Sequence, residues 1–259
     1  MSPMEPAPGT SDSESPLPRF SLVIPAYNEE IWLPRLLDTL DVARNAYTGG
    51  PSAIEVIVAD NASTDRTAEI ARERGCKVAH VEKRAIAAAR NGGAAMARGE
   101  YLCFVDADSL LDPDTFNAID RGLAKPNVIA GATGVRMERM SPGIALAYCM
   151  LLPLVWLMRM DTGVIFCRRE DFHSVGGYNE GKLFAEDLEF MFALRRLGKS
   201  RGQRLLRLRA ARAVTSTRKW DKHGEWHYIR ILFGGALALI LGKDIQERIA
   251  RPYWYDDPR

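Results

Sequence analysis

Asp106 and Asp108 are the residues of this chain whose type and spacing point most directly to chemistry. They follow residues 101–105, which are mostly apolar and predict a buried strand. Side chains two positions apart in an extended backbone leave it on the same side, so both carboxylates are expected to face one point. Mg²⁺ and Mn²⁺ are usually held by one or two carboxylates and the phosphate oxygens of a substrate. The pattern therefore predicts a metal and diphosphate site, with a surface turn as the plain alternative.

Polar residues follow two earlier apolar runs in the same way. Residues 25–30 and residues 60–65 each come directly after such a run, and both segments are rich in acids and amides. The carboxyl ends of parallel strands meet at one edge of a sheet, where open α/β sheets bind ligands. Each segment alone is typical of a turn or a helix cap. Their occurrence after three separate strands favours a shared site.

Short apolar runs alternate with helical patterns from Phe20 onward, which predicts an α/β fold with a mostly parallel central sheet flanked by helices. The first helix is expected to bury Leu33, Leu36, Leu37 and Leu40 on one face. Residues 205–214 predict one or two short strands. The other strands are expected over residues 20–24, 54–59, 77–81, 101–105, 128–133 and 163–167, and the other helices over residues 66–75, 84–98, 114–123, 144–158, 186–197 and 226–241.

The composition is that of a soluble, folded protein. The 259 residues are 47% apolar and 26% charged with a net charge of +2, which suits one large domain with a substantial core. Residues 1–18 are rich in proline, serine and acids without an apolar stretch, and predict a disordered tail rather than a secretory signal. The four cysteines are scattered, which predicts free thiols in a reducing compartment and a cytoplasmic location.

Two apolar runs and one basic run bear on membrane contact. Residues 144–158 and 231–241 fall short of the roughly 20 apolar residues that span a bilayer, so buried helices or a helix on a membrane surface are expected. Residues 195–222 carry many arginines and lysines and a single acid, Asp221. This run predicts a solvated surface, a phosphate clamp or a contact with anionic lipid. Peripheral attachment to the cytoplasmic membrane face therefore stays open beside a freely soluble protein.

Five segments occur in an order and at a spacing that together resemble the inverting glycosyltransferases of family 2. The segments are residues 21–30, 55–67, 88–92, 99–108 and 176–189. The resemblance implies the GT-A fold with a Rossmann-like nucleotide half, an Mn²⁺ or Mg²⁺ cofactor, and transfer of a sugar from a UDP- or GDP-sugar to an acceptor hydroxyl. A glycan, a lipid-linked molecule and a small molecule all stay open as acceptor, and no nucleic-acid partner is expected.

The same resemblance implies a division of the chain. A single domain over residues 19–242 would hold a nucleotide-sugar-binding half at residues 19–112, an acceptor half at residues 113–220 and a C-terminal helix at residues 221–242. Residues 243–259 would form a tail.

The resemblance also implies a donor site. Asp60 matches an acid that accepts from the base, and because a carboxylate only accepts, it selects a base with an N–H at that edge. Asp108 would bind the metal, and Asp106 the ribose or a metal-bound water. Arg84 and Arg90, both expected on the helix over residues 84–98, are candidate diphosphate donors. The further candidates are Pro25, Ala26, Tyr27 and Glu29 for base and ribose, Ala107 within the metal segment, Arg218 and Lys219 for the diphosphate, and His223 as a third metal ligand.

Glu186 and Asp187 open a predicted helix and resemble the base motif of the family. A helix N-terminus favours an ionised carboxylate, while burial in a closed cleft would raise its basicity. Asp187 is the expected base and Glu186 the alternative. Without the resemblance, the two acids are also explained by their favourable interaction with the helix N-terminus.

Three other functions are weighed against this interpretation. A nucleotidyltransferase would need a glycine-rich, basic phosphate loop after the first strand, whereas residues 25–30 contain two acids and no glycine. A non-catalytic nucleotide-sugar-binding protein would lack the base or Asp108. A nucleic-acid binder would rest only on residues 195–222. Processive polymer synthesis is disfavoured because the sequence has neither several long apolar spans nor a Gln-x-x-Arg-Trp motif.

Overall fold

One sheet positions the candidate residues of the chain. The computed structural model describes residues 17–158, 160–182 and 185–224, without the side chains of residues 151–158, 219 and 223. The predicted helix over residues 226–241, the tail at residues 243–259 and most of the predicted N-terminal tail lie outside the described residues.

The described strands form an eight-stranded sheet in the order β3-β2-β1-β4-β7-β6-β8-β5. β1 runs parallel to β2 and β4, β2 to β3, and β6 to β8, whereas β7 is antiparallel to its neighbours and β5 is antiparallel to β8. The predicted α/β fold with a mostly parallel sheet is confirmed. The strands are β1 (Phe20–Ala26), β2 (Ile54–Asp60), β3 (Lys77–His80), β4 (Tyr101–Phe104), β5 (Ser109–Leu110), β6 (Val128–Met137), β7 (Ile165–Arg168) and β8 (Arg204–Thr215).

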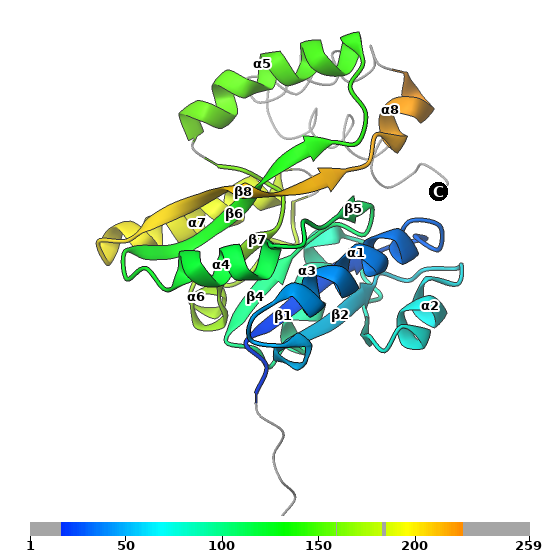
Figure 1. Ribbon diagram of the computed structural model, residues 1–259, viewed down its shortest axis with the longest axis horizontal. Coiled ribbons are helices and arrows are strands. Elements are labelled where there is room, and N and C mark those ends of the chain that lie inside the picture. Colours follow the sequence, from blue (N-terminus) through cyan, green and yellow to red (C-terminus); the bar gives the residue numbers. More distant parts are fainter. Residues whose placement is uncertain (1–16, 159, 183–184, 225–259) are drawn as a thin grey trace, which may run out of the picture.

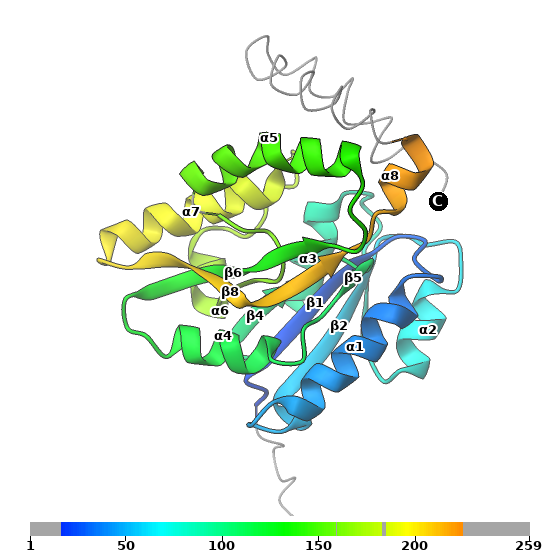
Figure 2. The ribbon, with the colours of Figure 1, turned by 45° about the horizontal axis from the view of Figure 1, so that its top comes forward.

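Helices cover both faces of this sheet (Figures 1 and 2). On one face lie α1 (Leu33–Ala46), α2 (Thr67–Glu73) and α4 (Thr115–Leu123), and on the other α3 (Ile86–Ala95), α6 (Arg169–Ser174) and α7 (Glu186–Ser200). The described chain also contains α5 (Pro142–Met158), α8 (Arg218–His223) and a short 3₁₀ helix at Pro51–Ala53.

The sequence explains why β1 is central. Phe20, Leu22 and Ile24 face one core and Val23 faces the other, so both sides of the strand are apolar and covered by helices. The predicted leucine face of α1 is confirmed as buried. On the opposite side α3 lies very close to the sheet. A Cβ atom on Gly93 would come within 2.4 Å of the Val23 side chain, so only glycine permits this approach. β1 is thereby held between two packed layers.

The differences from the predicted elements have physical causes. β4 ends at Phe104, so Asp106 and Asp108 lie in a loop and turn rather than in the predicted extended backbone. α3 begins at Ile86, so Arg84 precedes the helix on which it is expected from the sequence. Residues 205–214 belong to the single long strand β8, because β6 pairs along it through two register shifts. The short elements α6 and β5 have no clear sequence signal.

Two sequence expectations concern cysteines and membranes. All four cysteines are free thiols, and Cys103 and Cys167 are buried in the sheet as predicted. None of the helices that the structure describes is both long and apolar enough to cross a bilayer.

Candidate active site

Three polar segments leave the sheet at one edge, as the order of parallel strands requires. Ala26 of β1 lies beside Asp60 of β2, and Asp60 lies beside His80 of β3. β4 runs parallel to β1 and is followed directly by the segment that contains Asp106 and Asp108. The predicted convergence of these segments on one edge is confirmed.

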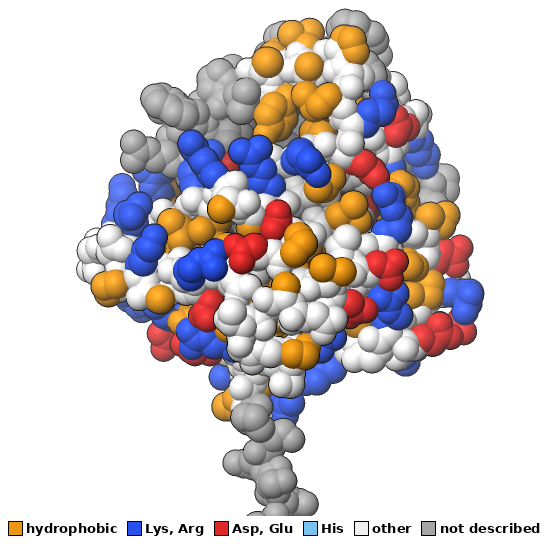
Figure 3. Space-filling view, viewed as in Figure 1, with side chains coloured by type: hydrophobic (Ala, Val, Ile, Leu, Met, Phe, Trp, Pro, Cys, Tyr) orange, Lys and Arg blue, Asp and Glu red, His pale blue; other side chains and the backbone are white. Residues whose placement is uncertain are grey.

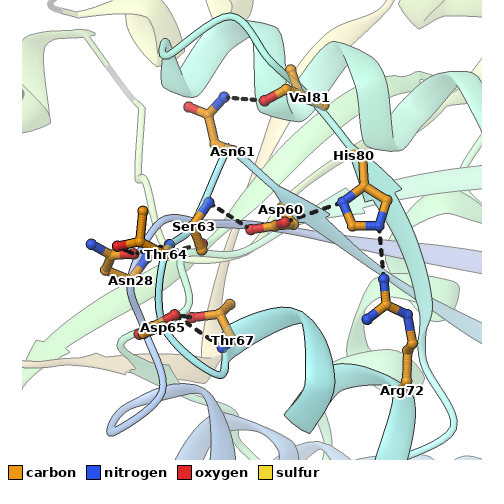
Figure 4. A network of polar contacts seen from close by, with 10 residues as sticks. All are labelled: Asn28, Asp60, Asn61, Ser63, Thr64, Asp65, Thr67, Arg72, His80 and Val81. Carbon is orange, nitrogen blue, oxygen red and sulfur yellow. Dashed lines mark hydrogen bonds and ion pairs between the residues drawn. The ribbon is translucent and has the colours of Figure 1, made fainter.

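Asp60 is held from two sides at this edge (Figure 4). Its Oδ1 accepts from the backbone N–H of Ser63 at 3.1 Å, and its Oδ2 lies 3.2 Å from Nδ1 of His80. The other ring nitrogen, Nε2, lies 2.8 Å from Nη2 of Arg72. Because an arginine can only donate, Nε2 accepts, and the neutral ring donates from Nδ1 to Asp60. The side chain of Asp60, only 7% exposed, is therefore oriented as a hydrogen-bond acceptor.

Hydrogen bonds tie the loop after β1 to the loop after β2 (Figure 4). Asn28 has a φ of 51°, a left-handed conformation that asparagine tolerates better than most residues. Its backbone N–H donates to Oγ of Ser63 at 3.0 Å, and its Oδ1 accepts from the N–H of Thr64 at 2.8 Å. The N–H of Glu29 donates to Oγ1 of Thr67 at 2.8 Å. Both loops beside Asp60 are therefore fixed by the protein itself.

Arg218, at the start of α8, joins two acids that follow different strands. Its Nη1 and Nη2 each donate to Glu29 at 2.6 Å, and its Nε lies 2.9 Å from Oδ2 of Asp108. Burial opposes the positive charge of Arg218, but the two acids raise its pKa above the ordinary value. The side chains of Glu29 and Asp108 are 3% and 13% exposed, so the arginine balances two shielded negative charges.

Arg90, on α3, joins Asp106 in the segment after β4 to the two acids that open α7. Its Nη2 lies 2.9 Å from Asp106, and its Nη1 lies 2.8 Å from Glu186 and 2.7 Å from Asp187. Burial alone would lower the pKa of Arg90, but Asp187, Tyr178, Asp106 and Glu186 raise it well above the ordinary value. One buried cation therefore faces three carboxylates.

Among the acids of the described chain, Asp187 has the most strongly shifted pKa. Burial raises the pKa of its carboxyl to about 7; Arg90 opposes this rise and Glu186 adds to it. Its Oδ1 and the hydroxyl of Tyr178 are both buried without a hydrogen bond of ordinary geometry. A carboxyl group with a pKa near neutrality can take up a proton at the pH of a cell, which is what a general base needs.

The acids after β4 fit one kind of metal site. Among the described residues no group of three or more His, Cys, Asp or Glu side chains is placed to hold a metal ion. Asp106 and Asp108 offer oxygen ligands, and the side chain of Asp106 is 52% exposed. Two carboxylates suffice for Mg²⁺ or Mn²⁺ when substrate phosphates supply further ligands. The residues therefore suit an ion that arrives with a diphosphate.

The other predicted site residues have less defined surroundings. The guanidinium of Arg84 stacks on the ring of Tyr27, 3.9 Å from its centroid, beside the loop that follows β1. The side chains of Lys219 and His223 lie outside the described residues, and their roles stay predictions. Three candidates contribute buried positions and backbone: Pro25, Ala26 and Ala107.

Sequence reasoning missed two residues that the structure brings to the site, His80 and Arg72, and it identified Tyr178 only as part of the segment before the acid pair. His80 ends β3, in register with Asp60, so the parallel strand order contained a usable signal. The ring of Tyr178 stacks on that of Phe190, with 4.2 Å between the ring centroids. The guanidinium carbon of Arg90 lies 5.1 Å from the centroid of the Tyr178 ring. Gly176 and Gly177 have φ of 82° and 69°, so the glycine pair that precedes Tyr178 is required by the backbone.

Comparison with solved structures identifies the class of this fold. The solved structures that it resembles are glycosyltransferases with the GT-A fold. One is a mannosyltransferase from Pyrobaculum calidifontis in complex with GDP-Man and Mn²⁺, with a TM-score of 0.63, 22% identity, and coverage of 93% of this chain and 72% of that one. Another is residues 1–349 of TarS from S. aureus in complex with UDP, with a TM-score of 0.58, 20% identity, and coverage of 91% and 70%. At these identities the likeness shows the fold.

The sequence shows the family. The sequence model described as glycosyl transferase family 2 matches residues 21–181, and the chain belongs to this family. A validoxylamine A glucosyltransferase from Streptomyces hygroscopicus subsp. limoneus is 36% identical over 127 residues, which are 47% of this chain and 26% of that protein. A human dolichyl-phosphate beta-glucosyltransferase is 31% identical over 146 residues, 51% of this chain and 45% of that protein. The chain thus spans less than half the length of either relative.

Proposed function

We propose that the protein is a metal-dependent, inverting glycosyltransferase that moves one sugar from a UDP- or GDP-sugar to an acceptor hydroxyl. The observation that carries the proposal is the set of acids at one sheet edge, bridged by the buried Arg90 and the partly buried Arg218. Membership of glycosyl transferase family 2 supports the reaction class. Solved neighbours in complex with UDP, UDP-GlcNAc, or GDP-Man and Mn²⁺ support the donor class.

The donor base would lie against Asp60. The relay from Arg72 through His80 leaves Asp60 as an oriented acceptor. A carboxylate acceptor suits a base that has a ring N–H at its pairing edge, as uracil and guanine have. The stacked pair of Tyr27 and Arg84 offers a flat surface on the same side. These contacts favour a uridine or guanosine diphosphate donor.

The diphosphate would lie beside Asp106, Asp108 and Arg218. Asp106 and Asp108 are the residues that would hold a divalent ion, and such an ion acts as a Lewis acid on the leaving diphosphate. Arg218 forms ion pairs with Glu29 and Asp108, and its guanidinium fork can donate to phosphate oxygens. We assign Lys219 and His223 only supporting roles here, as a further phosphate donor and a further metal ligand.

The acceptor hydroxyl would lose its proton to Asp187 as it attacks the anomeric carbon. Attack from the side opposite the diphosphate inverts that carbon in one step. Arg90 holds Asp187 and Asp106 in one network, so it couples the position of the base to the donor side of the site. Glu186 is the alternative base, since it contacts the same guanidinium. Positioned bases of this kind contribute about 10²- to 10⁴-fold to rate.

The acceptor and the location follow from weaker observations. A glycan, a lipid-linked molecule or a small molecule with a free hydroxyl suits the acceptor half of the chain. The buried free thiols Cys103 and Cys167 favour a reducing compartment, and we propose a cytoplasmic location on that ground.

A thermal-shift screen tests the donor class and the metal together. We expect UDP or GDP at about 100 times its dissociation constant to raise the melting temperature by roughly 5 to 10 °C when Mn²⁺ is present, and by much less without it. ADP and CDP, whose bases lack that ring N–H, should give smaller shifts. The Asp108→Asn variant should lose the part that depends on Mn²⁺. If no nucleoside diphosphate stabilises the protein with or without Mn²⁺, the proposed donor site is wrong.

A further inference from the structure

Helix α5 is apolar around its whole circumference and lies on the outside of the part of the fold that the structure describes. Residues 142–158 contain no charged side chain. Among the described elements, α5 is the outermost layer above β6 and β8 (Figures 1 and 2). Ile144 and Ala147, near its start, pack with Trp220 in a small buried cluster. Two other side chains of the helix, Leu146 and Met150, are 46% and 41% exposed, and Met140, just before the helix, is 59% exposed.

Such a helix is unusual on a water-exposed surface. A helix that is apolar on all sides is typically buried in a protein core or in lipid, because exposing its apolar surface to water is unfavourable. α5 has 17 residues, and no described helix has the length and hydropathy to span a bilayer. A position in the plane of a membrane surface would satisfy both observations.

Positive charge surrounds the same region. Arg136 on β6 and Arg209 and Arg212 on β8 are exposed, and none of the three forms an ion pair with an acid among the described residues. Arg136 and Arg212 lie on the same face of the sheet, because Gly134 pairs with Arg212 two residues before Arg136. Figure 3 shows basic side chains in a row directly below the apolar surface at the top of the molecule.

We propose that α5 and these three arginines form a docking surface for an anionic lipid bilayer. The exposed side chains of α5 would enter the boundary between headgroups and acyl chains, while Arg136, Arg209 and Arg212 would contact lipid phosphates. The charge favours lipid over a second copy of the chain, because a two-fold symmetric contact would bring the same unpaired arginines together. Docking requires no donor sugar, so this proposal and the proposed transferase activity can each fail alone.

Flotation of the full chain with lipid vesicles tests the docking surface. We expect binding to vesicles of phosphatidylcholine with phosphatidylglycerol, and little binding to phosphatidylcholine alone. Each Arg→Gln substitution should weaken binding roughly fivefold, so Arg209→Gln with Arg212→Gln should weaken it roughly 25-fold. Leu146→Glu with Met150→Glu should weaken it by about tenfold or more, because carboxylates resist entry into the bilayer.

The control is Val42→Glu, which places one such negative charge on an exposed apolar position of α1, 54% exposed. Helix α1 lies apart from α5 in Figure 1. The control variant should bind vesicles as the wild type does, and thermal melts should show that all variants are folded. Equal flotation with neutral and anionic vesicles, or no flotation at all, would overturn the proposal. So would unchanged binding by the Leu146→Glu, Met150→Glu variant, which would indicate that the chain itself covers α5. A shift of that variant from dimer to monomer in sedimentation would assign the surface to a second copy.

Discussion

Replacing Asp187 by asparagine should stabilise the protein at neutral pH while it destroys transfer. Burial raises the pKa of the Asp187 carboxyl from 3.8 to about 7, with Arg90 opposing and Glu186 adding to the rise. Each pKa unit corresponds to about 1.4 kcal/mol, so the complete shift is worth at most about 4 kcal/mol, given that the side chain keeps 22% exposure. Asparagine has the same shape and cannot ionise.

The sign follows from proton binding. The folded protein binds the Asp187 proton more tightly than the unfolded chain does, so the contribution to stability is complete below pH 3.8 and is lost as the pH rises through about 7. Between pH 5 and pH 8 the wild type should therefore lose about 3 kcal/mol of unfolding free energy relative to Asp187→Asn.

Urea unfolding at pH 5 and pH 8 measures this difference, and a transfer assay at saturating donor measures the catalytic loss. We expect kcat to fall by about 10²- to 10⁴-fold in Asp187→Asn, and kcat of the wild type to rise with pH through about 7 as the base ionises. Glu189→Gln is the control on the same helix. Burial opposes the ionised form of Glu189, but neighbouring cations lower its pKa, which is the opposite of the shift at Asp187. Full transfer by Asp187→Asn together with inactive Glu186→Gln would move the base to Glu186. Parallel stability curves for the wild type and Asp187→Asn would refute the buried, proton-binding carboxyl.

Three further substitutions test the network around the donor. Arg218→Ala removes the cation shared by Glu29 and Asp108 and should lower the unfolding free energy by about 2 to 4 kcal/mol in urea titrations. Arg218→Lys should have an intermediate effect. A loss below about 1 kcal/mol would show that these pairs contribute little. His80→Ala removes the donor that orients Asp60 and should raise KM for the nucleotide sugar roughly fivefold to tenfold with kcat unchanged, whereas a loss confined to kcat would contradict a positioning role. Asp60→Asn should weaken binding of the free nucleoside diphosphate by about tenfold or more in calorimetry, and equal affinity would remove Asp60 from the base pocket.

The first half of the fold could be predicted because its signals are local. The spacing of Leu33, Leu36, Leu37 and Leu40 alone defines the buried face of α1. Gly75 follows α2 with a φ of 71°, the conformation expected of a glycine at a helix end. Alternating strands and helices then require parallel pairing, which brings the three polar segments to one edge.

The contacts between these segments could not be predicted in the same way. Arg90 meets Asp106 and Asp187, and Arg218 meets Glu29 and Asp108, although most of these pairs are far apart in the sequence. Which charges meet depends on how the layers pack, and residue spacing contains no record of that. The end of β4 at Phe104 is likewise set by tertiary structure, because the next residues turn to form β5 beside β8.

Anomalous diffraction from crystals soaked with Mn²⁺ and UDP or GDP tests most directly whether the acids after β4 bind the donor through a divalent ion. The account predicts a manganese peak beside Asp108, in contact with the diphosphate, and Arg218 turned from Asp108 toward phosphate oxygens. A bound nucleotide with no manganese at Asp108, and with Arg218 still joining Glu29 to Asp108, would contradict it.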